Sequence, residues 1–370
     1  MKYALIGLCW IGSLVANAGS VSSTHAAYDG QALVLTGLVE LDHTLGQMRA
    51  EKALLSEQAP AGEAFPFTHI ALHKEVLLSL ADRGSFRCAH ATLDFTTLKG
   101  ALHAEEGETV SYTDLSGVPL QLNSRQIDLQ FEKKLSDYTV DNLLAQGAVV
   151  IHYNHDWVLH TDQALYSHAR QQITAAHASH IVHPSGKMVA EEIAWDLETQ
   201  TIDLKKPQGT LFTHNPDEPV YFVASSLAWN ALNQRMTLQE NVHIEQSTTQ
   251  AVIDADTAYI DFVTGTPTHL TLKGNIRLKT PPSAPVQRRA VSDHLQYSFA
   301  THTLILSADP HKKVLFVDDD QQTKISADEI HIVFDPETKQ QTIRGIGNVR
   351  VTLSAEENAL LQQLFPDKPS

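Results

Sequence analysis

Cysteine is almost missing from this chain of 370 residues, which contains only Cys9 and Cys88. Cys9 falls in an N-terminal segment with the composition of a cleaved leader, so the mature chain would keep a single cysteine and no intramolecular disulfide. Aromatic residues are also few, at 7%. The stability of the fold therefore has to come from backbone hydrogen bonds and from the packing of small and medium apolar side chains.

Positive charge is the second shortage. The sequence has 27 Lys and Arg residues against 43 Asp and Glu residues, which gives a net charge of −16, and no basic cluster relieves it. Nucleic acid is thus not an expected partner, because the neutralisation of phosphates supplies most of the affinity in such complexes. An anionic lipid stays compatible with this charge if its acyl chains make the main contact.

Long apolar runs are missing except at the start of the chain. Lys2 precedes an apolar stretch of 13 residues, Tyr3 to Val15, and Ala16-Asn17-Ala18 follows as a small-x-small cleavage site. A helix that spans a membrane needs about 20 apolar residues. Residues 1–18 are therefore interpreted as a secretory signal peptide, which predicts a location in the periplasm. An uncleaved anchor in the inner membrane is the alternative.

Motifs for catalysis or for cofactor binding are missing as well. The sequence has no nucleophile elbow, no phosphate loop and no H-E-x-x-H helix, so we predict neither an enzyme nor a cofactor. Two groups of histidines are close in sequence, namely His152, His155 and His160, and His177, His180 and His183. Zinc needs converging ligands, whereas a spacing of three on a strand alternates faces, which favours solvated or packing histidines. The run Asp318-Asp319-Asp320 is typical of a hairpin tip rather than of a calcium loop.

What the sequence has instead is a repeat. The same short pattern recurs nine times: an apolar residue, one intervening residue, a small residue, a usually polar pair, and two large or apolar residues one position apart. From Ala50 to Ala327 there are eight intervals, with a mean period of about 35 residues. Such a period predicts one supersecondary unit that is copied and stacked on its neighbours. The nine small residues are Ala50, Cys88, Ser124, Thr161, Ala190, Ala224, Ala255, Ser292 and Ala327.

The parity of the apolar positions changes inside each copy. In the copy Ile253 to Ile260, the residue two before Ala255 shares its face of a strand, whereas the residues three and five beyond it have the opposite parity. An extra residue that keeps the apolar set on one side while the strand turns a corner would explain this, so we predict a β-bulge or a sharp bend at each small residue. A helix is the rival interpretation, but the runs are short and bounded by turn residues.

A second kind of strand lies between the bends, in which Gly or Asn precedes alternating apolar residues. Examples are Leu35–Leu41, Leu272–Leu278 and Ile346–Val351. Each repeat then has two strands, on the order of 18 in total, mostly antiparallel because the connections are too short for crossover helices. The predicted fold is all-β: an elongated antiparallel sheet of about nine two-strand repeats with one polar and one apolar side.

The ends of the repeat define the predicted domains. The repetitive region covers residues 27–353, as one domain or as two tandem units with a soft boundary near residues 280–290. Beyond it, Ser354 to Glu357 is a capping box, and Leu360, Leu361, Leu364 and Phe365 follow at helical spacing until Pro366. We therefore predict a short helix in residues 354–370, which covers an edge strand or docks to a partner.

These two kinds of strand carry a resemblance. Tyr28 to Leu41, followed by Met48 to Ala53, resembles the opening of the OstA/LptA family of periplasmic lipopolysaccharide-transport proteins, whose pattern is G-x-L-x-L-x-G-x-V-x-L and then x-A-D-x-A. The resemblance runs through all nine repeats, from about Tyr28 to Leu353. It implies a bent antiparallel sheet, a β-jellyroll or β-taco, whose apolar interior takes lipid acyl chains and which stacks end to end with its partners.

The function predicted from the sequence follows from that interior. The chain would bind lipopolysaccharide or lipooligosaccharide and pass it between the inner and outer membranes. Its end strands would pair with the inner- and outer-membrane components of the transport line, or with further copies of the chain. The predicted lining residues are Val39, Leu41, Met48, Leu55, Phe86, Leu129, Val149, Ile151, Tyr166, Trp195, Phe222, Trp229, Ile244, Ile260, Tyr297 and Ile332.

Three alternatives stay open at the level of the sequence. The chain could be the membrane-anchored adaptor of the same transport system. It could be a structural or adhesive β-solenoid in which the lining residues simply fill one another's space as an ordinary core. A carbohydrate-active β-helix is the third, and it would need two carboxylates that converge in a groove.

Overall fold

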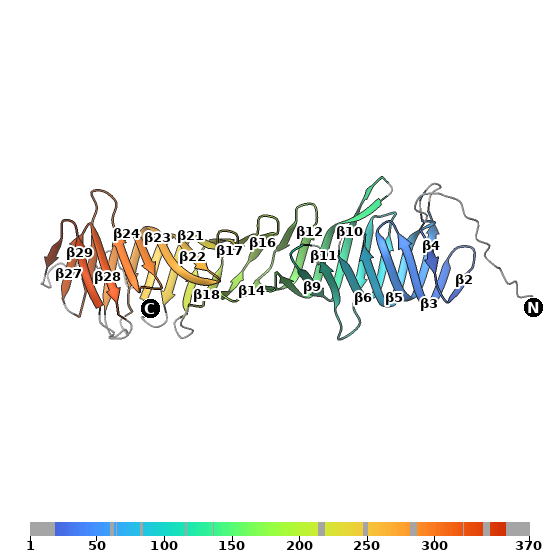
Figure 1. Cartoon of the computed structure of the whole chain (residues 1–370), viewed down its shortest axis with the longest axis horizontal. Helices are drawn as coiled ribbons and strands as arrows, with labels where there is room; N and C mark the ends of the chain where they lie inside the picture. Colours follow the sequence, from blue (N-terminus) through green and yellow to red (C-terminus); the bar gives the residue numbers. More distant parts are fainter. Residues whose placement is uncertain are drawn as a thin grey trace, which may run out of the picture. The chain divides into compact units, whose positions relative to one another are not determined.

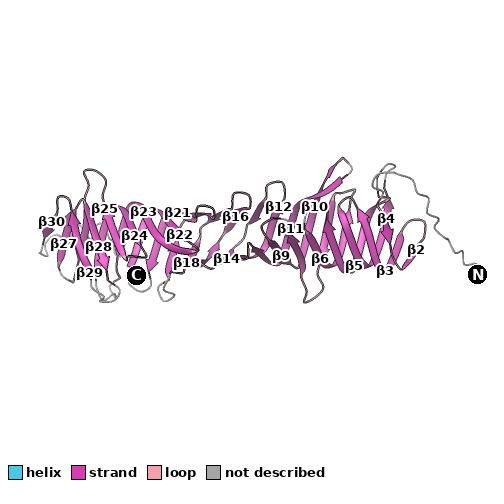
Figure 2. Ribbon diagram, viewed as in Figure 1, coloured by secondary structure: helices cyan, strands magenta, loops and turns pink. Residues whose placement is uncertain are grey.

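The computed structural model describes residues 19–352 apart from residues 60–62, 64, 82–83, 115–116, 136, 214–218, 247–250, 282–286, 321 and 336–340. Every regular element in these residues is a β-strand (Figure 2), which confirms the all-β prediction. The predicted signal peptide and the predicted C-terminal helix lie outside the described residues. Within the described ranges, no helix has the length and apolar character to cross a membrane.

The chain divides into two compact units, residues 1–147 and residues 148–370. The strands that lie in the first unit are β1 (Val21–Ser22), β2 (His25–Tyr28), β3 (Leu33–His43), β4 (Gly46–Gln58), β5 (Phe67–Leu80), β6 (Ser85–Asp94), β7 (Lys99–His103), β8 (Val110–Asp114), β9 (Leu120–Ser124) and β10 (Gln126–Lys134), followed by the first part of β11 (Asp137–Tyr153).

The second unit begins within β11. Its further strands are β12 (Trp157–Ser167), β13 (Gln172–Ala175), β14 (Ser179–His183), β15 (Gly186–Ala190), β16 (Glu192–Asp196), β17 (Thr201–Lys205), β18 (Gln208–Leu211), β19 (Val220–Val223), β20 (Ser226–Asn230), β21 (Arg235–Gln246), β22 (Ala251–Val263), β23 (Thr266–Lys279), β24 (Arg288–Ser298), β25 (Thr303–Ser307), β26 (Val314–Asp318), β27 (Thr323–Ala327), β28 (Glu329–Phe334), β29 (Gln341–Ile346) and β30 (Arg350–Thr352).

Within each unit the chain runs back and forth between the two edges of the sheet, and we call each such crossing a pass. Each pass pairs antiparallel with the next (Figure 1). Each pass also bends near its middle, and ten passes are interrupted there and count as two strands each. The 30 described strands thus form 20 passes, close to the predicted number of about 18.

The bend divides each unit into two walls. In β4, residues 46–49 pair with residues 77–80 of β5, and residues 52–58 pair with residues 67–73. We call the side that contains β8 and β9 in the first unit, and β14, β15, β18, β19, β26, β27 and β30 in the second, the first wall. The second wall contains β2, β7 and β10, and then β13, β16, β17, β20, β25, β28 and β29. The longer strands run through both walls.

The corners explain the parity change. Met48 and Ala50 face the core before the bend of β4, and Ala53 and Leu55 face it afterwards. Val39 of β3 pairs with Ala50, whereas Thr36 pairs with Lys52, so two residues of β3 stand opposite one residue of β4. The predicted bend is therefore present, but the extra residue lies in β3, the neighbouring strand of the kind with Gly or Asn. It does not lie in β4, the strand that carries the small residue. This is a correction to the prediction from the sequence.

The bulge needs two consecutive left-handed residues. Gly37 and Leu38 have φ values of 75° and 49°, and Gly274 and Asn275 have values of 79° and 48°. Left-handed backbone strains most side chains but not glycine, and asparagine tolerates it well. The Gly and Asn residues that mark the second kind of strand are therefore the residues that let β3 and β23 turn the corner, whereas β5 does so with Lys74 and Glu75, at φ values of 65° and 49°.

The polar residue that follows several of the small residues also serves the corner. Asp256 accepts a hydrogen bond of 2.8 Å from the Asn275 side chain, which belongs to the bulge of the next pass. Glu191 and Lys206 form the equivalent contact at 3.0 Å. These pairs lie on the exposed outer face, where each contributes at most about 1 kcal/mol. They give a role to the acidic residues that follow Ala190 and Ala255, and Ser225 after Ala224 likewise accepts a hydrogen bond of 3.0 Å from the Asn241 side chain.

Gly274 and Gly265 offer a matched test of the corner. Both have a φ of 79°, but a Cβ on Gly274 would lie 2.3 Å from an Asp256 carboxylate oxygen, whereas a Cβ on Gly265 would meet nothing within 4 Å. We expect Gly265→Ala to cost about 1 kcal/mol for the left-handed backbone, and Gly274→Ala to cost at least about 1 kcal/mol more. Urea unfolding followed by tryptophan fluorescence measures both. Equal losses would mean that the corner contact contributes nothing.

Candidate functional site

The candidate site is the apolar interior between the two walls of each unit. Fourteen of the sixteen lining residues predicted from the sequence are buried, and the remaining two, Tyr297 and Ile332, are half-buried. Their side chains lie on the side of the sheet that the parity rule assigned to them. The first unit holds Val39, Leu41, Met48, Leu55, Phe86 and Leu129, and the second unit holds the other ten.

In the first unit these residues form rows across paired strands. On the first wall, Leu41 pairs with Met48, and the row continues through Leu78 to Phe86 and Tyr112. The Phe86 and Tyr112 rings lie 4.7 Å apart between centroids. Rows of this kind bury each apolar side chain against its neighbours on adjacent strands, which is the unit of stabilisation in a sheet.

In the second unit one row runs along the whole second wall. Each member pairs directly with the next, and six members were predicted from the sequence. The row is Tyr166, Ile173, Trp195, Ile202, Trp229, Met236, Ile260, Leu270, Tyr297, Leu304, Ile332 and Ile343.

The exposure of this row changes along its length. The first eight members are at most 5% exposed, whereas Tyr297, Leu304, Ile332 and Ile343 are half-buried. The adjacent row nearer the corner, through Leu306, is fully buried even there. The interior of the second unit is thus closed over most of its length and partly open at β24, β25, β28 and β29.

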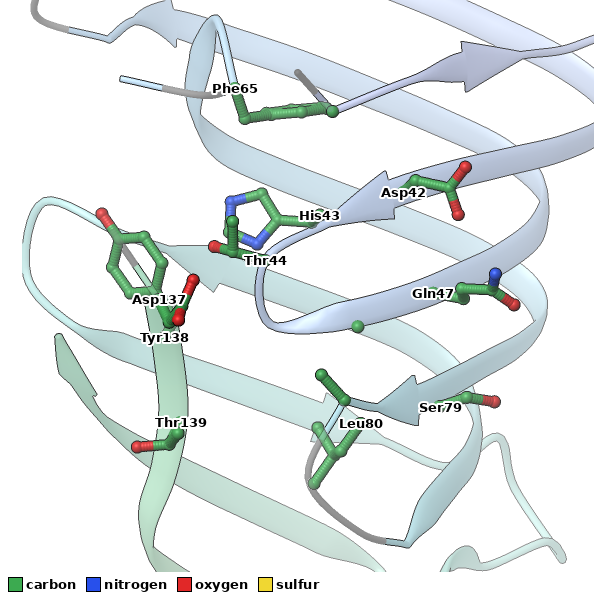
Figure 3. A pocket seen from close by; sticks show the side chains of 13 residues that line it. Asp42, His43, Thr44, Gln47, Phe65, Ser79, Leu80, Asp137, Tyr138 and Thr139 are labelled. Carbon is green, nitrogen blue, oxygen red and sulfur yellow. The ribbon is translucent and has the colours of Figure 1, made fainter. Parts of the chain in front are cut away.

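In the first unit, hairpin ends close the edge of the interior. A recess of about 750 Å³ lies at this edge. Within it, His43 lies between Phe65 and Tyr138 (Figure 3). The His43 ring stacks on Phe95 at 4.2 Å between centroids and contacts Tyr138 at 5.4 Å. His43 comes from the first wall and Phe95 from the second, so this stack joins the two walls at their free ends.

The hairpin of β10 and β11 brings Tyr138 to this place. Its register shifts between Gln130 and Phe131, which lets the end of the hairpin leave the plane of the sheet. Lys133 near its tip pairs with Glu63 at 2.6 Å. The polar residues around the recess, Asp42 and Asp137 among them, come from hairpin ends and not from the interior.

Burial governs the charge of His43. Its Nδ1 accepts the backbone N–H of Leu45 at 3.1 Å, so the neutral ring carries its proton on Nε2. Burial lowers the pKa of His43 from 6.5 to about 4, and the nearby Glu63 carboxylate opposes this shift in part. A neutral imidazole that stacks on aromatic rings is thus part of the closure of the first unit.

This pKa predicts a pH-dependent stability. Unfolded His43 binds a proton below its ordinary pKa of 6.5, whereas the folded form stays neutral down to about pH 4. The stabilisation is therefore complete above pH 6.5 and is lost as the pH falls from 6.5 to about 4, by at most about 3 kcal/mol. His43→Phe keeps an aromatic ring and removes the proton. Between pH 6.5 and about 4, we expect the first unit of the His43→Phe variant to lose less stability than that of the parent chain, as measured by hydrogen exchange. Parallel pH profiles for the two proteins would contradict the assignment.

An aromatic cluster closes the second unit in a similar way. Tyr153 and Trp157, at the free end of the first wall, contact Trp195 of the second wall at centroid distances of 4.9 and 5.7 Å. Trp157 also reaches Trp229 at 5.6 Å, and Trp229 packs on Phe262 at 4.6 Å. We call these five residues, with His183, the mouth cluster. Only Trp195 and Trp229 were predicted as lining residues. The alternation Val149, Ile151, Tyr153 continues up to the hairpin turn and could have revealed Tyr153.

The histidines and the aspartate run take ordinary places. His183 stacks on the Trp157 ring at 4.1 Å, which makes it a packing histidine, and the other five histidines of the two groups are exposed. In the described part of the chain, no group of three His, Cys, Asp or Glu residues has an arrangement suited to a metal ion. Asp318 ends β26, and Asp319 and Asp320 form the turn that follows.

Comparisons with known proteins add little. A scan against protein-family models finds no match, and a search of curated proteins finds none either. Among solved structures, the chain is similar to LptH, described as the LptA homologous periplasmic component of the conserved lipopolysaccharide transport device from Pseudomonas aeruginosa. The match covers 38% of this chain and 97% of that one at 12% identity, with a TM-score of 0.31. At these values the similarity carries no argument about function.

Proposed function

We propose that this chain is a periplasmic carrier that binds lipopolysaccharide or lipooligosaccharide by its acyl chains, between the walls of each unit. The main support is the row of apolar side chains on the second wall of the second unit, which is buried over eight strands and half-buried at its last four members. Burying acyl chains there gains about 0.8 kcal/mol per methylene and needs no directional bond. The location rests on the signal peptide predicted from the sequence.

The charge of the chain favours acyl contacts over phosphate contacts. With a net charge of −16, the protein has no general attraction for anionic headgroups. Arg288 and Arg289 near the partly open end already pair with Asp318 and Asp319 at 3.1 and 2.7 Å. A lipid would therefore be held by its hydrocarbon, while its headgroup stays at the free edges of the walls.

Partners would join through the end strands. Among the described strands, β1 and β2 of the first unit pair only with β3, and β29 and β30 of the second unit pair only with β28 and β27. End strands of a sheet offer backbone N–H and C=O groups to a further strand. We propose that they pair with membrane components of the transport line or with further copies of the chain.

A structural protein without a lipid ligand is the second candidate. It is favoured by the near-complete burial of most lining residues, which fill one another's space as an ordinary core does. The two candidates differ at the partly open end, where a carrier would admit a lipid and a structural protein would not.

Native mass spectrometry of the protein purified from its own envelope distinguishes these candidates. We expect adducts with the masses of acylated envelope lipids. Leu304→Gln, on the inner face, should reduce them several-fold, whereas Ile305→Gln, which faces outward on the same strand, should not. Protein free of lipid, and unable to take up added lipopolysaccharide, would refute the carrier and leave the structural protein.

A further inference from the structure

The mouth cluster holds every tryptophan of the chain except Trp10. Trp157, Trp195 and Trp229 are 6%, 2% and 4% exposed. Trp157 contacts Trp195 and Trp229 across the walls edge-to-face, and His183 meets Trp229 in a tilted arrangement. Such contacts between rings are weak individually, so the two walls are held together at this edge by packing rather than by hydrogen bonds. In the row on the second wall, Ile202 lies between Trp195 and Trp229, and Met236 and Ile260 follow Trp229.

Two polar groups in the cluster lack the partner that burial normally requires. The Tyr153 hydroxyl and the Trp229 indole Nε1 are buried, and neither has a hydrogen-bond partner in the described residues. Buried donors are nearly always paired, because an unpaired donor has lost its bonds to water without replacement. Burial also raises the pKa of Tyr153, so its hydroxyl keeps its proton and remains a donor. The cluster thus presents two unused donors, one from each wall.

We propose that the mouth cluster is a binding site for the carbonyl end of an acyl chain, with the Tyr153 hydroxyl and the Trp229 N–H as donors to an ester or amide oxygen. This inference rests on the proposed function and makes it specific. The hydrocarbon would lie along Ile202, Met236 and Ile260 after the rings of the two walls separate.

The chemistry of the cluster selects a neutral acceptor. A phosphate or carboxylate would have to lose its water among aromatic rings without a cation, because no Lys or Arg is among the members of the cluster. The donors of Tyr and Trp can bond a carbonyl oxygen without that cost. A simple alkyl chain would fill the space but leave both donors unpaired. The site therefore favours acylated lipids over alkyl amphiphiles of equal length.

The test uses the intrinsic fluorescence of the mature full-length protein, whose tryptophans all lie in the cluster once residues 1–18 are removed. The probes are a short-chain ester lysophosphatidylcholine and its ether analogue, which lacks only the carbonyl, both below micelle formation. We expect the ester to change the emission and to bind about tenfold more tightly than the ether. In Tyr153→Phe this ratio should fall to near one while the ether binds as before. Tyr259→Phe, on the outer face, is the control and should keep the ratio.

The outcomes distinguish a failure of the acyl-carbonyl site from a failure of the carrier function. A tenfold preference that Tyr153→Phe removes supports the site. Equal affinity for the two probes, or an emission that neither probe alters while lipid adducts are found by mass spectrometry, would overturn the site and leave the carrier function standing. If neither probe binds and no lipid is retained, the proposed function fails together with the site. Tyr153→Phe should also fold as well as the parent chain, since it removes a donor that has no partner.

Discussion

Phe86→Ala is expected to lower the free energy of unfolding of the first unit by about 3–5 kcal/mol. Phe86 is 0% exposed and lies in the inner row between Leu78 and Tyr112. Its removal leaves a cavity between paired strands that have little freedom to collapse. Hydrogen exchange of the backbone amides of β5, β6 and β8 measures this loss locally.

The neighbouring residue provides the control. Arg87 follows Phe86 in β6, is exposed, and points to the opposite face. Arg87→Ala should therefore change the stability by less than about 0.5 kcal/mol. Similar losses for the two variants would show that the alternation along β6 does not separate an inner face from an outer one.

Asp318→Ala is expected to destabilise the second unit by about 3 kcal/mol. Its side chain is 2% exposed and accepts a hydrogen bond of 3.1 Å from Arg288 Nε, and Arg288 is itself only 18% exposed. Removing one partner leaves a largely buried charge without compensation, which costs more than the pair itself contributes. Arg288 also donates to the Gln341 side chain in β29, which belongs to the second wall. The loss should appear in urea unfolding followed by tryptophan fluorescence.

Asp319 is the matched control for this pair. It binds Arg289 through two hydrogen bonds of 2.7 and 3.0 Å, but both side chains are more exposed than those of the first pair. Water screens this interaction, so Asp319→Ala should cost about 1 kcal/mol or less. A loss as large as that for Asp318 would mean that burial does not set the difference between the two pairs.

The repeat was enough to predict the architecture because every corner solves the same steric problem. The spacing of three between Ala50 and Ala53 reflects the bend, and it recurs up to Ala327 and Ile330. The position of the extra residue was not predictable from that spacing alone, because it lies on the partner strand, where Leu35 and Val39 keep the same parity. The positive φ at Gly37 and Leu38 is what identifies it.

The inward-facing residues were predictable from the repeat, whereas the residues that close the edge of the interior were not. Tyr166 and Ile260 follow from alternation within a strand. His43 and Phe95, in contrast, lie at hairpin ends on different walls, and only the bend of each pass brings them together. Period-two patterns carry no information about which strand ends meet. The graded exposure from Leu270 to Leu304 likewise depends on the neighbours of each strand rather than on its own sequence.

Site-specific photo-crosslinking in living cells tests the central claim, that the space between the walls holds acyl chains. Crosslinkers at the inward positions Val149, Trp195 and Ile244 should capture lipopolysaccharide or lipooligosaccharide. Crosslinkers at the outward, exposed positions Glu40 and Arg277 should capture none. Capture that is as strong at the outward positions as at the inward ones would contradict the account. So would a failure to capture lipid at either set of positions.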